Sequence, residues 1–431
     1  MKLIAAIAAF PLFMLAQPTA FHQAGFKAGD VGGDGWSTWA PRPETAPRAY
    51  VDSRGGRGSL ALSGDKNPAV FGGWERTVRG IQPEIWYHFR ARYRAEGLDY
   101  APRQVVSRLD WIGENGRRAG QPEYPWEVTP DGDWSLVTMS AKAPKGAAGV
   151  RIQLLLVNAP RATLWWDEVL LEPAPAPAAR PVTVASVNLY PRKTADPTGD
   201  FLSLLERSLA RETDVVLLPE GITVVGTGKS YADVAEAIPG PTTARLGEFA
   251  RRRKIWLVAG LYEREKQVIY NTAVLIDREG RLAGRYRKVY IPREEFEGGI
   301  TPGSDYPVFH TDFGTIGLMI CWDSEFADPA RALALRGAEM ILMPIWGGNE
   351  TLSKARAIEN RVFLVASGYD HPTYILDPDG ATLAQASARG SIASTTVDLS
   401  RRYPDPWLGD MRGRFMKELR LDTPVDPPGR R

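Results

Sequence analysis

The sequence has few of the residues that build metal sites and disulfide frameworks. Its 431 residues include 1 cysteine and 4 histidines. One cysteine cannot close an internal disulfide, and the scattered histidines offer none of the spacings typical of zinc ligands. The sequence therefore excludes a disulfide scaffold, and we expect no metal site and no metal cofactor.

Net charge is also nearly absent. Lys and Arg total 53 against 51 Asp and Glu, a formal charge of +2. This balance gives no reason to expect nucleic acid or an anionic membrane as a partner, and it suits a small or neutral substrate. The hydrophobic share of 44% is ordinary for a soluble globular protein, but the length exceeds what one core usually organises. We therefore expect two domains.

Long apolar runs are missing except at the N-terminus. Residues 1–20 read MKLIAAIAAFPLFMLAQPTA, a lysine followed by an apolar run from Leu3 to Ala16. The run is shorter than the about 20 residues of a membrane-spanning helix, which favours a cleaved signal peptide over the alternative of a retained anchor. We therefore expect export, to the periplasm or outside the cell, with the cleavage site left open.

Prolines alternating with alanine mark a boundary further along the chain. The segment EPAPAPAAR, residues 172–180, favours an extended, semi-stiff backbone, so we expect it to link two domains. Before it, residues 21–171 contain short runs such as GSLALSG, IWYHFRARYRA and GVRIQLLLV between turn residues. Their alternation and spacing predict an all-β sandwich.

After the linker, residues 181–400 alternate between strand and helix patterns. PVTVASVNL and TDVVLLPE are typical of strands, DFLSLLERSLARE is typical of an amphipathic helix, and Asp277 to Gly280 fits a hairpin turn. Such alternation predicts an α/β layered domain with catalytic residues at the carboxyl ends of strands. Residues 401–431 form a C-terminal extension whose role the sequence leaves open.

Three polar residues stand at the ends of apolar strand patterns in the α/β half: Glu220, Lys288 and Cys321. Taken singly, they are ordinary as a loop carboxylate, a surface lysine and a buried small side chain. Taken together, they form a nucleophile site. A thiol attacks only as thiolate, so Cys321 needs a nearby base, which Glu220 could provide. When the thiolate attacks a carbonyl carbon, Lys288 and the backbone N–H of Trp322 could stabilise the oxyanion that forms.

The motifs around these residues resemble the nitrilase, or carbon-nitrogen hydrolase, superfamily. LLPE contains Glu220, RYRKVYIP contains Lys288, and ICWDSEFADPARALALRGAEMILMP contains Cys321, in the family's chain order. ARAIENRVFLVAS and DPDGATLAQA match the family's pattern further on. The resemblance implies a four-layer α-β-β-α sandwich, no cofactor, and a homodimer or higher homo-oligomer.

The same resemblance implies a mechanism. Glu220 takes the proton of Cys321, the thiolate attacks an amide carbon, Lys288 steadies the oxyanion, and water hydrolyses the resulting thioester. Relatives also carry a second glutamate that positions the substrate and the lysine. In REEFEGGITPG the best match is Glu297, with Glu295 as the alternative.

Substrate contacts are expected from three further residues. Trp322 follows the cysteine, and Trp346 and Asn349 follow the next strand pattern in MPIWGGN. Trp346 is as well explained by core packing, since aromatic rings dominate protein interiors.

The β-rich half resembles the jelly-roll, galactose-binding-like modules attached to secreted enzymes, with ATLWWDEVLLE as the most characteristic piece. The resemblance implies carbohydrate as a possible partner. Seven of the nine tryptophans in this half could include sugar-stacking rings, although we expect most of the seven to fill the core. They are Trp74, Trp86, Trp111, Trp126, Trp134, Trp165 and Trp166.

We expect a hydrolase that cleaves a non-peptide carbon–nitrogen bond in an amide or carbamoyl compound. Asp323, where true nitrilases commonly carry glutamate, favours amides over nitriles. Nitrile hydrolysis and acyl transfer by the same thiol stay open, as does a catalytically silent carbohydrate- or surface-binding protein. TVVGTGKS lacks the first glycine of a phosphate-binding loop. His310 and His371 have no flanking signature of a cysteine–histidine pair.

Overall fold

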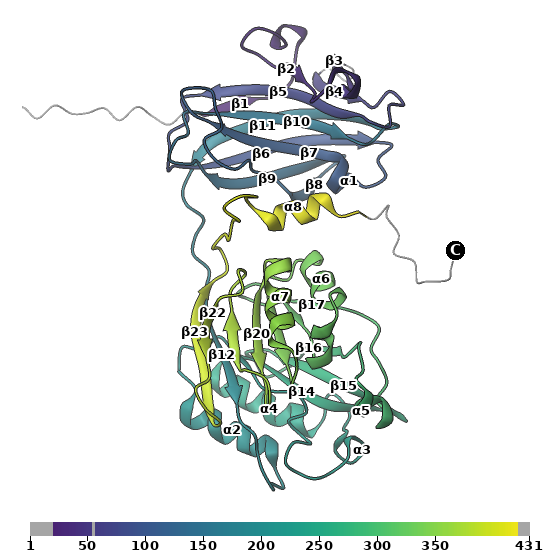
Figure 1. Cartoon of the computed structure of the whole chain (residues 1–431), viewed down its shortest axis with the longest axis vertical. Coiled ribbons are helices and arrows are strands. Elements are labelled where there is room, and N and C mark those ends of the chain that lie inside the picture. Colours follow the sequence, from purple (N-terminus) through teal and green to yellow (C-terminus); the bar gives the residue numbers. More distant parts are fainter. Residues whose placement is uncertain (1–19, 54–56, 421–431) are drawn as a thin grey trace, which may run out of the picture. The chain divides into compact units, whose positions relative to one another are not determined.

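The computed structural model describes residues 20–53 and 57–420, which form two compact units (Figure 1). The first unit comprises the described residues of Met1–Pro177 and Pro404–Arg431, and the second is Ala178–Tyr403. The expected signal peptide, residues 1–20, lies outside the described residues except for Ala20. Within the described residues, no helix combines the length and apolar character that a membrane span requires.

The first unit is built from two antiparallel sheets. In the larger sheet the order is β3 (Arg48–Asp52), β4 (Ser59–Ser63), β11 (Thr163–Ala174), β6 (Trp86–Glu96), β9 (Trp134–Lys142) and β8 (Glu127–Asp131), and β1 (Phe21–Gln23) also pairs with β11. In the smaller sheet the order is β2 (Ser37–Trp39), β5 (Phe71–Arg79), β10 (Gly149–Val157) and β7 (Val105–Ile112). The unit is therefore a β-sandwich, while its assignment to the jelly-roll class stays a prediction.

Alternation along the strands builds the sandwich core. In β6, Phe89, Ala91 and Tyr93 point into the core, whereas the arginines between them lie on the outer face of the sheet. Of the seven tryptophans, Trp74, Trp111 and Trp166 belong to the buried core and Trp126 packs against it from a partly buried position. Most of the aromatic surface of this unit is therefore committed to packing.

The strand β11 extends into the segment expected to be a linker. Its pairing with β6 continues through Glu172, Pro173 and Ala174, so only the residues after Ala174 leave the sheet before β12 begins at Pro181. The register of β1 ends opposite Leu171, which leaves β11 with β6 on one side at this point. A proline without an N–H donor is tolerated at such a locally unpaired edge.

The C-terminal segment returns to the first unit. The helix α8 (Met411–Glu418) is capped by Asp410 and contacts the short helix α1 (Ala101–Gln104). An added Cβ at Gly413 would lie 2.6 Å from Trp126 Cδ1, so the helix backbone is close against the sandwich. The buried Lys417 donates from Nζ to the backbone oxygen of Val105 at 3.0 Å.

Lys417→Met is expected to raise the free energy of unfolding of the first unit at pH 7 by about 1–3 kcal/mol. Burial lowers the pKa of Lys417 to about 8 from an ordinary value of 10.5. Between those values the folded state has released a proton that the unfolded state still holds, so stability rises with pH across this window. The variant should lose this rise, as measured by thermal unfolding at pH 7 and pH 10. Lys145→Met, at an exposed position of the same unit, should change neither quantity.

The second unit has two six-stranded mixed sheets. The first has the order β16 (Leu282–Arg287), β15 (Val268–Ile276), β14 (Trp256–Glu265), β13 (Val215–Leu217), β12 (Pro181–Asn188) and β23 (Ser391–Asp398). The second has the order β17 (Val308–His310), β18 (Thr315–Leu318), β19 (Met340–Pro344), β20 (Phe363–Ser367), β21 (Tyr374–Leu376) and β22 (Thr382–Gln385). The hairpin between β15 and β16 has its turn at Asp277 to Gly280, as the sequence predicts.

The two sheets pack face to face between helices. Ser186 Oγ donates to Ala366 O at 2.7 Å and Ser367 Oγ donates to Val187 O at 2.6 Å, which ties the sheets together through their buried faces. The helices α2 (Pro197–Ser208) and α4 (Pro241–Arg253) cover the first sheet, and α6 (Asp328–Leu335) and α7 (Glu350–Asn360) cover the second. The expected α-β-β-α order of layers is therefore present (Figure 1).

The central strands of both sheets are parallel, which brings their carboxyl ends to one edge. Strands β12, β13 and β14 are parallel in the first sheet, as are β18, β19 and β20 in the second. Strands such as VVL in β13 and MILMP in β19 are entirely buried because both of their faces are covered. The short helix α3 (Tyr231–Val234) follows β13 and the 3-10 helix η3 (Cys321–Glu325) follows β18, whereas the short helix α5 (Arg293–Glu297) follows the antiparallel edge strand β16.

Candidate active site

Glu220, Lys288 and Cys321 line one cavity of the second unit. Glu220 follows β13, Lys288 follows β16 and Cys321 follows β18, so three strands deliver the three side chains. The cavity has a volume of about 500 Å³. Its remaining lining is Val224, Gly228, Lys229, Tyr231, Tyr262, Pro292, Glu294, Glu295, Trp322, Trp346 and Gly347.

A buried lysine joins two buried glutamates in this cavity. Lys288 Nζ lies 2.8 Å from Glu220 Oε1 and 2.8 Å from Glu295 Oε2, and the lysine side chain is 1% exposed. Asn271 Nδ2 donates to both carboxylates, at 2.6 Å to Glu220 and 2.5 Å to Glu295. Tyr262 donates its hydroxyl to Glu295 at 3.2 Å. The carboxylates are thus fixed by donors on several sides.

The electrostatics of the cluster keep Lys288 charged. Burial alone would lower its pKa, but Glu220, the Cys321 thiol and Glu295 raise it above the ordinary value for lysine. Burial raises the pKa of Glu295, Lys288 opposes that shift, and Glu220 adds to it. Lys288 is therefore a permanent cation that serves as a hydrogen-bond donor.

Cys321 sits in a strained turn between β18 and the helical segment that follows. Its φ of 44° lies in the left-handed region, which is uncommon for a residue with a side chain and is often found at functional sites. The thiol donates to Gly347 O at 3.3 Å. This turn directs the sulfur into the cavity that Glu220 and Lys288 share.

The thiol is protonated at rest. Burial raises the pKa of Cys321 to about 12, with a further increase from the Glu220 carboxylate and a smaller opposing effect from Lys288. Glu220 Oε2 is buried and has no hydrogen-bond partner among the described residues. One carboxylate oxygen is thus held by Lys288 and Asn271, while the other is open to accept a proton.

Comparison with known proteins identifies the family. Residues 183–406, just over half of the chain, match the carbon-nitrogen hydrolase family. The chain belongs to this family. The match covers the second unit and leaves the N-terminal sandwich outside it.

The chain is also similar to individual known proteins. A probable nitrilase from Schizosaccharomyces pombe is 33% identical over 44% of this chain and 78% of its own length. The omega-amidase NIT2 from Homo sapiens is 28% identical over 46% of this chain and 82% of its own length. The solved structure of an amidase from Nesterenkonia sp. AN1 is similar over 52% of this chain and 93% of that one, with 23% identity and a TM-score of 0.45.

The second glutamate that contacts Lys288 is Glu295 and not Glu297, the residue favoured from sequence. The two positions lie on opposite sides of α5: Glu295 is buried beside Lys288, whereas Glu297 is exposed. A five-residue helix turns neighbouring glutamates to different faces, and the spacing from the EGG motif does not indicate which face meets the cavity. The expectation that Glu297 lies beside Lys288 is therefore wrong, and the alternative, Glu295, occupies that position.

The three expected substrate contacts have different positions. Trp322 is 39% exposed and lines the cavity. Trp346 also lines it while packing edge-on against Tyr369 and Tyr190, so the packing and pocket interpretations both hold. Asn349 is outside the described lining, because its side chain caps α7 by accepting from the backbone N–H groups of Thr351 and Leu352.

Sequence reasoning missed Asp323 as a positioning residue. Its buried carboxylate accepts from Ile320 N at 2.9 Å, Tyr290 N at 3.0 Å and the Tyr286 hydroxyl at 2.7 Å. Ile320 precedes Cys321, and Tyr286 and Tyr290 flank Lys288. Asp323 thus joins the turn that carries the thiol to the segment that carries the lysine.

Asp323→Asn is expected to lower kcat/KM for the hydrolase's substrate by about 10–100-fold, because hydrogen bonds to a buried charged acceptor are worth about 1.5–3 kcal/mol. The amide keeps the size of the side chain but replaces one acceptor oxygen with a donor. Steady-state kinetics should show the loss mainly in kcat, since the turn positions the Cys321 thiol in the cavity. Asp328→Asn is the control, because Asp328 accepts from the Tyr290 hydroxyl at the surface and should cost little.

Proposed function

We propose that the second unit hydrolyses a small amide or carbamoyl compound through a thioester on Cys321. One observation carries the proposal: Glu220 and Cys321 share a cavity. Lys288 holds the buried Glu220 while Glu220 Oε2 has no hydrogen-bond partner among the described residues, and Cys321 lies in a strained turn after β18. The relatives named as amidases support an amide as the substrate. The presence of a complete nucleophile, base and cation argues against a catalytically silent protein.

The reaction follows from the positions of these groups. Glu220 accepts the thiol proton as the sulfur attacks the carbonyl carbon, and Lys288 stabilises the charge that develops on the carbonyl oxygen. When the tetrahedral intermediate collapses, the carbon–nitrogen bond breaks and Glu220 returns its proton to the departing ammonia or amine. A water molecule then gives a proton to Glu220 and attacks the thioester. The carbon–sulfur bond breaks, the acid is released, and Glu220 returns the proton to the Cys321 thiolate.

The buried cluster suits these proton transfers. Because the pKa of Lys288 is raised, the lysine keeps its proton throughout and Glu220 is left as the group that exchanges protons. Glu295 and Asn271 hold the lysine and the Glu220 carboxylate in place without occupying Glu220 Oε2. This division assigns Glu220 to proton transfer, Lys288 to charge stabilisation and Glu295 to positioning.

The proposal is tested by detecting both the product and the intermediate. The purified protein should release ammonia from at least one member of a panel of small amides and carbamoyl compounds, with a Cys321→Ala chain as the blank. After an acid quench, intact-mass and peptide analysis should find the acyl group on Cys321. Nitriles and hydroxylamine belong in the panel, because nitrile turnover or hydroxamate formation would identify the alternative uses of the thiol. Absence of turnover and of an acyl adduct with every compound would contradict the proposal.

We also propose export of the protein, supported by the sequence of residues 1–20. Expression of the full chain in a bacterial host, followed by fractionation and N-terminal sequencing, tests it. A processed chain in the periplasm or medium is expected, and an unprocessed cytosolic chain would contradict the proposal.

A further inference from the structure

The cavity that contains Cys321 extends well beyond the residues proposed to react. Its volume of about 500 Å³ lies within the range of about 300–1,000 Å³ typical of small-ligand sites, whereas an amide group itself consists of only a few atoms. The charged groups beside the thiol are buried, and Lys288 pairs with both Glu220 and Glu295. The rest of the lining therefore faces a part of the substrate that takes no part in the reaction.

One wall of this cavity is apolar. Four of its lining residues also belong to one hydrophobic cluster or pack against it: Val224, Tyr231, Tyr262 and Trp346. Tyr231 stacks on Tyr262, with ring centroids 4.5 Å apart and an interplanar angle of 28°. An added Cβ at Gly298, the C-cap of α5, would lie 2.8 Å from Tyr231 Cδ2, so the end of α5 is close against the same ring. Tyr231 is therefore held in place where it lines the cavity.

Trp322 adds an exposed aromatic ring to the lining. Its side chain packs edge-on against Phe326, which in turn stacks on Tyr290 with ring centroids 3.8 Å apart. The indole is thus supported from one side, yet it is 39% exposed. The helix that carries Glu295 also exposes Phe296, at 75%. Apolar surface held in contact with water favours an apolar ligand that covers it.

The charges of the lining favour neither sign on the rest of the substrate. The lining carries two lysines and three glutamates, so an anionic or a cationic group would meet repulsion as well as attraction. Glu294 is exposed and pairs with Arg293 at 3.1 Å, and Lys229 is also exposed. Water and salt screen such exposed charges. A neutral group therefore suits this part of the cavity better than a charged one.

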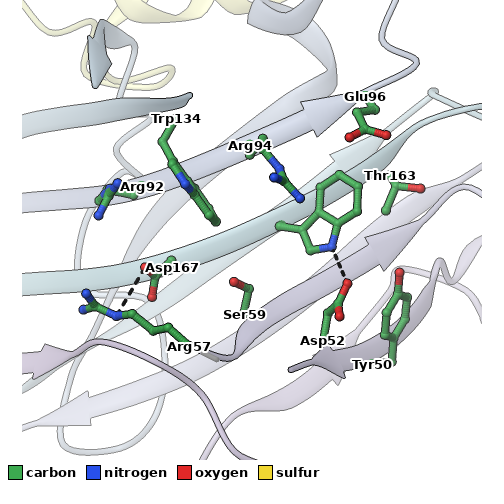
Figure 2. A pocket seen from close by; sticks show the side chains of 11 residues that line it. Tyr50, Asp52, Arg57, Ser59, Arg92, Arg94, Glu96, Trp134, Thr163 and Asp167 are labelled. Atoms are coloured by element: carbon green, nitrogen blue, oxygen red, sulfur yellow. Dashed lines mark hydrogen bonds and ion pairs between the residues drawn. The ribbon is translucent and has the colours of Figure 1, made fainter. Parts of the chain in front are cut away.

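A pocket on the outer face of the larger sheet of the first unit differs in character (Figure 2). It has a volume of about 690 Å³ and a lining rich in charged side chains, among which Arg57 lies 3.6 Å from Asp167. The guanidinium groups of Arg92 and Arg94 lie over the ring of Trp134, with Cζ 5.3 Å and 5.7 Å from its centroid. Cations already cover this indole, whereas the ring of Trp322 in the second unit is exposed.

We propose that the cavity of the second unit selects amides whose acyl group is a neutral hydrocarbon tail of medium length, with Tyr231 and Trp322 as the rings that cover the tail. The amide group then lies at Cys321 and the tail lies along the apolar wall. Each buried methylene group should increase affinity by up to about fourfold. The inference rests on the proposed function in naming the ligand an amide, but its binding test needs no turnover.

The first experiment measures binding to the full chain carrying Cys321→Ala, which lacks the thiol and should not turn the ligands over. Butyramide, hexanamide and octanamide are titrated by calorimetry, and the weaker ligands are measured by competition against octanamide. Octanamide should bind at least about tenfold more tightly than butyramide. Succinamate has the length of butyramide but ends in a carboxylate, and it should bind no more tightly than butyramide.

Variants of the two rings test where the tail lies. Trp322→Ala and Tyr231→Ala should each reduce the ratio of octanamide to butyramide affinity at least about threefold, because each removes apolar surface from the tail. Trp322→Phe and Tyr231→Phe keep a ring and should retain most of the ratio. Because the ratio compares two ligands on one variant, effects on the amide end cancel.

The matched control is Trp134→Ala, which removes an indole from the pocket of the first unit (Figure 2) and should leave the ratio unchanged. Unaltered thermal unfolding of each variant separates lost contacts from lost folding. Absence of octanamide binding, equal affinity for octanamide and butyramide, tighter binding of succinamate than of butyramide, or a ratio unchanged in both Trp322→Ala and Tyr231→Ala would overturn the proposal.

Kinetics of the unmodified protein separate this inference from the proposed function. The value of kcat/KM should rise from butyramide to octanamide, mainly through a lower KM, because the tail binds equally in the substrate and the transition state. Hydrolysis without a trend in tail length would overturn the selectivity and leave the proposed function intact. A trend in binding without hydrolysis would support the selectivity and contradict the proposed function.

Discussion

Replacing Glu220 with glutamine is expected to lower kcat/KM for amide hydrolysis by about 10³–10⁴-fold while making the Cys321 thiol more acidic. Glutamine keeps the shape of the side chain but cannot accept the thiol proton or return one to the leaving amine. The same change removes an anion that raises the pKa of Cys321, while Lys288, which lowers it, remains. Catalysis and thiol acidity should therefore move in opposite directions.

Two measurements check this pair of effects. Ammonia release gives the loss of activity, and the pH dependence of alkylation by iodoacetamide gives the thiol pKa, which should shift down from about 12 in the unmodified protein. Glu297→Gln is the matched control, because it neutralises an exposed glutamate two residues from Glu295 and should change neither quantity. A Glu220→Gln chain that keeps its activity, or whose thiol becomes less acidic, would contradict the assignment of Glu220.

Glu220 and Cys321 could be predicted from the sequence because each follows an apolar strand pattern, whereas Lys288 follows the mixed strand LAGRYR of β16. Buried strands such as VVL before Glu220 and TIGL before Cys321 are read from composition, and the carboxyl ends of parallel strands share an edge. Convergence of Glu220, Lys288 and Cys321 in one cavity then follows from topology. The two-sheet sandwich before the linker was readable for a similar reason, since period-2 alternation specifies strands directly.

The direction of a side chain on a short helix or turn could not be predicted from the sequence. Glu295 and Glu297 differ by two residues on a short helix, and only the packed structure determines which one meets Lys288. The sequence predicts Asn349 in the pocket, but an asparagine ahead of a helical pattern is also a typical N-cap, and Asn349 caps α7 in the structure. The extension 401–431 gave no indication that α8 packs on the first unit, because its contacts join residues far apart in the sequence.

The buried Asn271 shows what a single sequence conceals. An asparagine inside the apolar strand β15 is unusual, yet nothing in the local pattern assigns it a partner. In the structure its amide bridges Glu220 and Glu295, two carboxylates from different segments. A polar residue at an inward position of a buried strand is therefore a signal for a site, although its role appears only when its neighbours are known.

The second large effect is expected when Lys288, the cation between Glu220 and Glu295, is removed. Lys288→Met is expected to lower kcat/KM by more than about 10³-fold and to reduce the free energy of unfolding by about 3–5 kcal/mol, since it leaves buried charges without their partner. Lys288 opposes the raised pKa of Glu295, so its loss should raise that pKa further. Kinetics and chemical denaturation measure the two losses. Lys354→Met, which breaks a pair with Glu350 on the surface of α7, should change stability by less than about 0.5 kcal/mol.

A second substitution separates the two roles of the lysine. In Lys288→Met with Glu295→Gln, one of the two stranded carboxylates is neutralised, and the repulsion between Glu220 and Glu295 disappears. We expect the double variant to regain at least about half of the lost stability, because uncompensated charge is the main cost of the single change. Activity should stay at the level of the single variant, since no cation faces the oxyanion. If the double variant recovers both activity and stability, Lys288 acts only by stabilising the fold. If it recovers stability alone, the reaction itself needs the positive charge of Lys288.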